Sequence, residues 1–209
     1  MQNQFTKAMA FRHACKIFDT TKKISDEKIR YILEAGRTSP SSFGMEAWKF
    51  LVITNQELKE KMRPLCWNQP QITTCSHLIV VLAGIESVKP SSGEVEKRFA
   101  RRALSQEQIK GYIDLYSNHL ANTLSSDKHI YEWTARQTYI AVANMMTAGA
   151  FEGIDSCPIE GFEKEKLEKL LELDTTKFQI SMLLPVGYRV NEQSKQLRLD
   201  FDEVVEFVG

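Results

Sequence analysis

The chain has 209 residues, enough for one domain with a sizeable core. Its 27 Lys and Arg side chains balance its 27 Asp and Glu side chains, so the formal net charge is zero and gives no electrostatic footprint for a nucleic acid or an anionic membrane. No stretch reaches the roughly 18 apolar residues of a membrane-spanning helix, and the N-terminal segment lacks a signal peptide's long apolar core, so we expect a cytoplasmic protein.

The first predicted elements are a helix, a turn and a strand. Ser25 is suited to capping a helix, and the apolar spacing after it predicts that this helix ends near 36–37. A turn rich in Ser follows over 39–44. The aromatic and β-branched residues of 48–54 then predict a strand.

The middle of the chain is expected to hold a short helix, a buried strand and two long helices. The short helix covers 56–65, and the nearly all-apolar run 77–83 is typical of a strand that is covered on both faces of a sheet. The polar segment 87–97 is predicted to be a loop. Helices follow at about 105–124 and 129–153, and the second is apolar enough to be buried in a core or a subunit interface.

The last predicted elements are a short strand over 154–158, a charged helix over 163–173, and a strand over 178–190 that Pro185 and Gly187 break. The tail beyond them has no clear period and resembles an arm that packs on another surface. This order of elements predicts a mixed α+β layer structure around a central sheet. The apolar helix and the arm favour a dimer.

The four cysteines have neither C-x-x-C nor zinc-site spacing, so we expect no metal site and free thiols in a reducing compartment. Cys15 lies among Arg12, His13 and Lys16, which would lower its pKa and make it reactive. A small, half-buried packing residue is the favoured interpretation of Cys15. His77 is likewise favoured as a core residue rather than a ligand.

Three short segments could bind an anion or a polar ring, but each has an ordinary structural interpretation. Arg12 and Lys16 fall on the same side of a helix end or of an extended strand, as two cations around a phosphate would. The turn 38–42 and the connector 158–162 offer hydroxyl and backbone N–H groups. Taken singly, these patterns favour a solvated basic helix end, a polar turn and a strand-to-helix connector.

Taken together and in order, these segments resemble the FMN-dependent nitroreductase family, of the oxygen-insensitive NAD(P)H nitroreductase type. The resemblance covers the chain except for a variable region from about 85 to 128. The matching strings are RHACKIFD (12–19), SPSSFGMEAWKFLVI (39–53), the Asn68 loop followed by CSHLIVV (75–81), EWTARQTYIAVANMM (132–146), GIDSCPIEGF (153–162) and LLPVGYR (183–189).

The resemblance implies a single nitroreductase-like α+β domain over 1–209, with a central mixed sheet flanked by helices. It implies a helical lid at about 85–128, a C-terminal arm over 191–209, and an intertwined homodimer with FMN at each subunit interface. It also implies hydride transfer from NADH or NADPH through FMN to nitroaromatic or quinone-type acceptors, in a ping-pong cycle.

The resemblance also assigns site residues. Arg12, Lys16 and Arg198 would hold the FMN phosphate and ribityl groups, and the backbone at Glu160 and Gly161 would face flavin N5, with no side chain identified as a catalytic acid or base. The full cofactor set is Arg12, His13, Ala14, Lys16, Pro40, Ser41, Ser42, Gly44, Asn68, Gln71, Pro158, Ile159, Glu160, Gly161, Lys195 and Arg198. In the family, the turn with Ser41 and Ser42 reaches the flavin from the other subunit. The residues predicted to contact the acceptor are Phe43, Tyr112, Tyr116 and His119.

The sequence departs from the family pattern at several cofactor positions. Ala14 replaces a frequent Ser, Gly44 replaces a frequent Asn, and Lys195 is one position away from the usual second cation near Arg198. Gln71 replaces a Lys near flavin N1, which should lower the flavin potential. A flavin-binding protein with little reductase activity, acting as a sensor or in storage, is therefore the main alternative. A dimeric interaction protein without flavin is the second.

Overall fold

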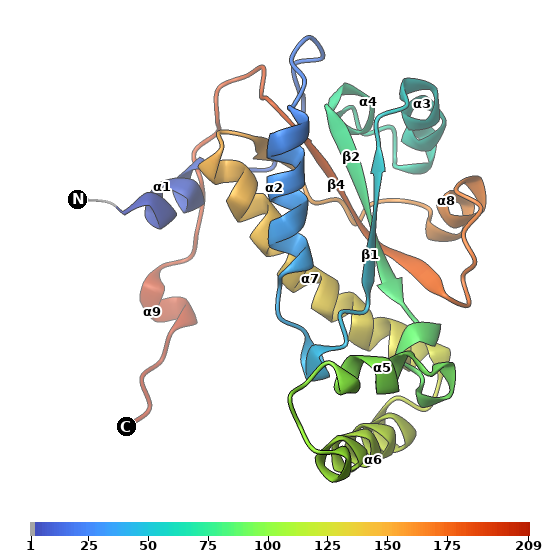
Figure 1. Ribbon diagram of the computed structural model, residues 1–209. Helices are drawn as coiled ribbons and strands as arrows, with labels where there is room; N and C mark the ends of the chain where they lie inside the picture. Colours follow the sequence, from blue (N-terminus) through green and yellow to red (C-terminus); the bar gives the residue numbers. More distant parts are fainter. Residues whose placement is uncertain (1–2) are drawn as a thin grey trace.

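The computed structural model describes residues 3–209 and is built around a four-stranded sheet (Figure 1). The strands β1 (Trp48–Ile53), β2 (His77–Gly84), β3 (Asp155–Ser156) and β4 (Phe178–Gly187) lie in the order β1-β2-β4-β3. The α+β class is confirmed, but the expected mixed sheet is wrong for these strands, because every neighbouring pair is antiparallel. A parallel pairing occurs only as an isolated bridge, between Ala14 and Ser156, within the described chain.

The helices expected over 25–37, 56–65, 105–124, 129–153 and 163–173 are all present. Ser25 caps the first of them, where its Oγ accepts a hydrogen bond from Lys28 N at 3.4 Å. The α-helices are α1 (Gln4–Phe11), α2 (Asp26–Arg37), α3 (Gln56–Leu65), α4 (Gln71–Thr74), α5 (Glu94–Ala100), α6 (Gln106–Thr123), α7 (Asp127–Phe151), α8 (Lys164–Leu170) and α9 (Phe201–Val204). The loop expected over 87–97 is partly wrong, because α5 begins inside it.

The central strand β2 is covered on both faces, as its apolar run predicts. Ile79 and Val81 face a cluster that includes Ile32 of α2 and Met145 of α7. The alternate residues, Leu78 among them, face a second cluster that α3, α4 and α8 complete. Figure 1 shows α2 and α7 lying along one side of the sheet, with α3, α4 and α8 on the other.

Pro185 does not break β4, contrary to the expectation from the sequence. It lies opposite Leu78 of β2 in the register, and its carbonyl oxygen accepts a hydrogen bond from Cys157 N at 3.1 Å. The missing N–H of a proline is tolerated here because the carbonyl still pairs with the chain beside β4.

A third hydrophobic cluster joins α5, α6 and the start of α7 below the sheet (Figure 1). It contains Phe99, Tyr116 and Trp133 and extends to Met45, which follows the turn after α2. The region 85–128 therefore packs directly on that turn. None of the described helices is both long enough and apolar enough to cross a membrane.

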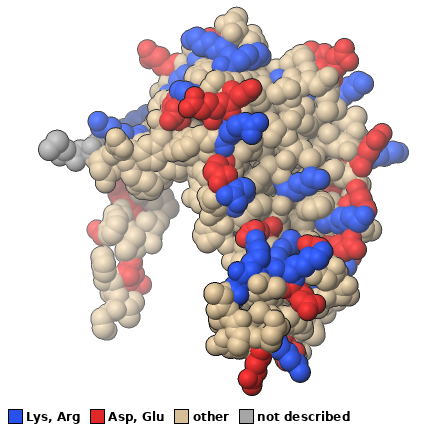
Figure 2. Space-filling model, in the orientation of Figure 1, with Lys and Arg blue, Asp and Glu red and all other residues tan. Residues whose placement is uncertain are grey.

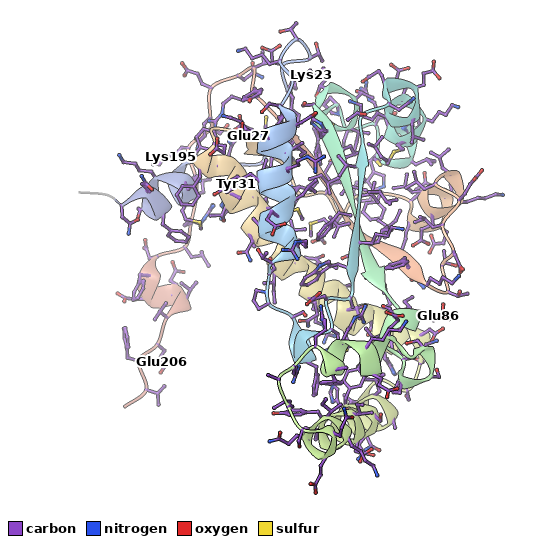
Figure 3. The ribbon with its side chains drawn as sticks, viewed as in Figure 1. Lys23, Glu27, Tyr31, Glu86, Lys195 and Glu206 are labelled. Atoms are coloured by element: carbon purple, nitrogen blue, oxygen red, sulfur yellow. The ribbon has the colours of Figure 1, made fainter. Side chains whose placement is uncertain are left out.

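The arm over 191–209 lies beside α1 at its start and extends away from the body at its end (Figures 1 and 3). Gln193 Nε2 donates to Ala10 O at 2.7 Å, which attaches the start of the arm to the end of α1. Its later large apolar residues are exposed: Leu197, Leu199, Phe201, Val204, Phe207 and Val208. This exposed apolar surface is unusual for a segment without a partner.

Candidate functional site

The segment 12–16 is an extended strand rather than a basic helix end. Helix α1 ends at Phe11, and Arg12 already has extended backbone angles, with φ −66° and ψ 129°. The bridge from Ala14 to Ser156 then holds the segment along β3, and Cys15 N donates to Ser156 O at 3.2 Å. Cys15 N also lies 3.1 Å from His13 O, so the segment contains a tight turn at Ala14. Cys15 is buried, whereas Lys16 is exposed.

The buried carboxylate of Asp155 contacts this strand and Arg189. Asp155 Oδ1 lies 2.6 Å from the guanidinium nitrogen Nη2 of Arg189, and Asp155 Oδ2 accepts a hydrogen bond from the backbone N–H of Arg189 at 2.9 Å. The ring nitrogen Nδ1 of His13 lies 3.6 Å from the same carboxylate. The Arg189 guanidinium also stacks over the Phe11 ring, 4.1 Å from its centroid. Asp155 of β3 thus joins the strand 12–16 to Arg189, which follows the end of β4.

Lys16 and Gln71 meet at the sulfur of Cys157. Lys16 Nζ lies 3.7 Å from Cys157 Sγ, and Gln71 Nε2 lies 3.8 Å from the same atom. Gln71 is 1% exposed, and its Oε1 is buried without a hydrogen-bond partner among residues 3–209. A buried, unpaired amide oxygen is unfavourable unless a ligand donates to it, so this atom indicates a binding site.

The stretch 158–161 presents its backbone next to this meeting point. Ile159 turns its side chain into the core, where Ile159 N donates to Leu183 O at 2.8 Å, while Pro158 and Glu160 are exposed. Within residues 3–209, no protein acceptor is hydrogen-bonded to the N–H of Glu160 or Gly161. Two neighbouring free N–H groups on a rigid stretch can donate to the edge of a ligand ring.

Gln69, which the sequence interpretation missed, connects these parts. Gln71 Nε2 donates to Gln69 Oε1 at 2.9 Å, and Gln69 Nε2 donates to Gly161 O at 2.9 Å. This chain of hydrogen bonds fixes the position of Gly161 relative to Gln71. Nothing in the local pattern marks Gln69, because the contact joins positions 92 residues apart.

Trp67 is a second residue that the sequence interpretation missed. Trp67 and Asn68 both have positive φ, 54° and 56°, and Asn68 O accepts from Arg63 Nε at 3.1 Å. A Cβ added to Gly161 would lie 2.6 Å from the Trp67 ring, so the indole lies directly against this glycine. Trp67 is nevertheless 69% exposed. An exposed indole beside the free N–H groups could stack on a planar ligand.

The turn with Ser41 and Ser42 is held by hydrogen bonds but lies far from the segment 12–16. Ser42 N donates to Gln137 Oε1 of α7 at 2.9 Å, and Ser41 Oγ accepts from Glu46 N at 2.9 Å. Figure 1 shows this turn beyond the far end of α2 from the strand 12–16. One chain therefore does not bring Ser41 to Lys16. Pro40 and Gly44 belong to the same distant turn.

The predicted acceptor residues are divided between the core and the surface. Tyr116 is fully buried and its hydroxyl donates to Val88 O at 2.5 Å, so its prediction as an acceptor contact is wrong. Phe43 packs against Tyr116 and His119, with ring centroids 5.2 and 5.6 Å apart. Tyr112 is partly exposed and stacks on Phe99.

The arm passes close to Arg12. Gln196 Nε2 donates to the carbonyl oxygen of Arg12, which places Arg198 two residues beyond that contact. Gln196 occupies this inward position, while Lys195 and Arg198 are exposed. Figure 3 shows Lys195 beside α1, and Glu206 at the distant end of the arm. The Nε of Arg12 is buried without a partner among the described residues.

The cysteines lack the character of nucleophiles. All four are unpaired and buried, and burial raises the pKa of Cys15 and of Cys75 to about 11 and that of Cys66 to about 12. The interpretation of Cys15 as a packing residue is confirmed, and the reactive alternative is wrong. Burial also lowers the pKa of His77, whose Nδ1 lies 3.0 Å from Ser76 Oγ. No cluster of three or more His, Cys, Asp or Glu within 3–209 could hold a metal ion.

These observations fit a ligand that has a planar ring and an anionic tail. The ring would find the amide oxygen of Gln71, the N–H groups of Glu160 and Gly161, and the exposed indole of Trp67. The tail would lie along the segment 12–16, which carries the cations Arg12 and Lys16. Two cations suit a phosphate, which accepts several charge-assisted hydrogen bonds.

Comparisons with known proteins show what the whole chain is similar to. The family model described as Nitroreductase family matches residues 9–188. "Putative NAD(P)H nitroreductase YfkO" of Bacillus subtilis is 38% identical over 218 residues, covering 100% of this chain and 99% of the relative. A Haemophilus influenzae protein named "Putative NAD(P)H nitroreductase" is 42% identical over 206 residues, covering 95% of this chain and 93% of the relative.

Solved structures share the fold. A nitroreductase-like protein of Streptococcus mutans has a TM-score of 0.89 and 18% identity, covering 100% of both chains. A protein of Exiguobacterium sibiricum named "putative nitroreductase in complex with FMN" has a TM-score of 0.83 and 23% identity, covering 99% of this chain and 98% of that chain.

Proposed function

This chain belongs to the nitroreductase family, and we propose that it is an FMN-dependent oxidoreductase that transfers hydride from NADH or NADPH to a nitroaromatic or quinone-type acceptor in a ping-pong cycle. The unpaired Oε1 of buried Gln71, next to Lys16 and to the free N–H groups at 160–161, carries this proposal. The relatives named NAD(P)H nitroreductase and the FMN complex of a structural neighbour support it.

The residues of this chain would bind and orient the cofactor rather than exchange protons with it. Bound FMN would supply the hydride-accepting and hydride-donating chemistry. Arg12 and Lys16 would hold its phosphate and ribityl groups, with Arg198 reaching the same phosphate from the arm. Gln71 and the backbone at 160–161 would bind the ring edge. Positioning of this kind is the main demand of hydride transfer.

Trp67 and the residues around it would form the acceptor side. Its exposed indole lies against Gly161, where it offers a flat surface to an aromatic acceptor. Of the residues predicted to contact the acceptor, Phe43, Tyr112 and His119 stay predictions. They would act with the lid over about 85–128.

We infer that the working form is a cytoplasmic homodimer. The turn with Ser41 and Ser42 lies far from Lys16 in one chain, so it would reach the FMN of the other subunit. The exposed apolar arm and exposed Tyr139, Ile140 and Phe151 on α7 provide surface for such an interface. Four free cysteines suit a reducing compartment.

The first test is the flavin content of the purified protein. We expect a yellow protein with about one FMN per subunit and anaerobic bleaching of the flavin by NADH or NADPH. Bleaching followed by reoxidation with a nitroaromatic or a quinone would identify the acceptor. A colourless protein that does not bind added FMN would refute the proposal. Bound FMN that neither nicotinamide bleaches would favour the alternative, a flavin-binding protein with little reductase activity.

A second test concerns the electrostatics at Gln71. Gln71→Lys would add a cation beside Lys16, where reduction brings negative charge to the flavin. We expect the midpoint potential to rise by about 30 mV or more, since 30 mV corresponds to about 1.4 kcal/mol for a two-electron couple. Gln71→Met removes the amide without adding charge and is the matched control. Equal potentials for the two variants would show that position 71 does not face the flavin.

A further inference from the structure

The turn after α2 has a backbone conformation that needs external support. Phe43, Gly44 and Glu46 have positive φ values of 54°, 66° and 46°. Positive φ is unfavourable for residues other than glycine, so it persists only where the surroundings hold it. The contacts that hold this turn therefore determine where Ser41 and Ser42 lie.

Arg102 makes the most direct of these contacts. Its terminal nitrogen donates to Phe43 O at 2.7 Å, and a Cβ added to Gly44 would lie 3.5 Å from the same guanidinium. The guanidinium is itself fixed, because it lies over the rings of Phe99 and Tyr112 at 4.7 and 5.2 Å from their centroids. A planar cation held against two aromatic rings has a restricted orientation, so it donates in a defined direction.

The neighbouring Arg101 provides a contrast. It pairs with Glu46 at 3.0 Å, but the side chains are 54% and 45% exposed. Exposed ion pairs contribute little because water and salt screen them. Figure 2 shows that basic side chains gather over α5. Of Arg101 and Arg102, only Arg102 donates to a carbonyl oxygen of the turn among the described hydrogen bonds.

We propose that Arg102 is a positioning residue of the flavin site: by holding the carbonyl of Phe43, it fixes the turn in the shape in which Ser41 and Ser42 reach the cofactor. This inference rests on the proposed function, in which the turn of one subunit approaches the FMN of the other. Because Arg102 belongs to the variable region 85–128, this region would act on the cofactor through the turn.

The test compares Arg102→Met, Arg102→Lys and Arg101→Met in the full-length protein. Met keeps the packing against the rings but has no donor, while Lys keeps a charged donor without the planar fork. The readouts are the FMN dissociation constant and the hydrogen exchange of amides 41–47 in FMN-free protein. The exchange measurement reports on the turn without depending on activity.

For Arg102→Met we expect FMN to bind about tenfold more weakly or worse, with faster exchange confined to 41–47, because the partly buried carbonyl of Phe43 loses a charged donor. Arg102→Lys should recover part of both losses. Arg101→Met should stay within about threefold of the parent protein.

Parent-like values of both readouts in Arg102→Met would overturn the inference, and so would faster exchange throughout the chain. If Arg102→Met fails to fold, Arg102→Lys decides: intermediate values support the inference and parent-like values overturn it. If the parent protein binds no FMN, the proposed function fails, whereas the exchange arm still tests whether Arg102 holds the turn.

Discussion

Replacing both Arg12 and Lys16 by Ala should abolish FMN retention during purification and weaken FMN binding by roughly a hundredfold or more. Each charge-assisted hydrogen bond contributes about 1.5–3 kcal/mol, and every 1.4 kcal/mol is a factor of ten in affinity. Ala14 provides no hydroxyl at this strand, so the anionic tail depends more heavily on the two cations. The measurement is titration of FMN-free protein with FMN, followed by flavin fluorescence.

The fold should survive this double change. Within the described chain, Lys16 Nζ has only the sulfur of Cys157 as a partner, and the Arg12 guanidinium contacts Met9 Sδ at 3.5 Å. The matched control is Lys22→Ala with Lys23→Ala, which removes the same charge from two exposed side chains. If FMN affinity survives in Arg12→Ala and in Lys16→Ala, the assignment of the phosphate site to this strand is wrong.

The sequence predicted the helices and strands well where a local pattern decides the structure. Ser25 caps α2 because its side chain accepts a hydrogen bond from a nearby N–H. The nearly all-apolar run of β2 predicts a strand covered on both faces, and clusters with helices lie on both of its faces. The antiparallel pairing of the strands depends on how the chain reverses between them. Neither composition nor periodicity describes that path.

The strand 12–16 shows where local patterns fail. Two cations four residues apart favour a basic helix end when read alone. The pairing of Ala14 with Ser156 makes the segment extended instead, and that partner lies far away in the sequence. The resemblance to a family assigned Arg12 and Lys16 to a cofactor site, but it did not predict this pairing.

Tyr116 and Gln69 show two further kinds of failure. Tyr116 lies on the same face of α6 as the buried Ile109 and Leu120, at helical spacing, so its burial could have been inferred from the period. Gln69 has no such signal, because its role is a hydrogen bond to Gly161 across the fold. Polar contacts of this kind become visible only once the chain is folded.

The largest expected loss of stability comes from Asp155→Ala. The carboxylate is 3% exposed and pairs with Arg189, whose side chain is 21% exposed, so its removal leaves a mostly buried guanidinium without its charged partner. Breaking a buried pair in this way costs about 3–5 kcal/mol of unfolding free energy, and a domain of this size loses roughly 2–4 °C of melting temperature per kcal/mol. Melting followed by circular dichroism in FMN-free protein measures the effect, and we expect a decrease of about 6 °C or more.

Two controls separate this buried pair from ordinary surface charge. Glu34→Ala removes a carboxylate from an exposed pair with Arg37 and should leave the melting temperature close to that of the parent protein, because water and salt screen such a pair. Asp155→Asn keeps an acceptor for Arg189 N and should lie between the parent protein and Asp155→Ala. Asp155 also lies beside His13, which belongs to the strand that carries Arg12 and Lys16. Asp155→Ala removes this contact, so we expect it to weaken FMN binding as well. A melting temperature like that of Glu34→Ala would show that Asp155 does not hold this strand in place.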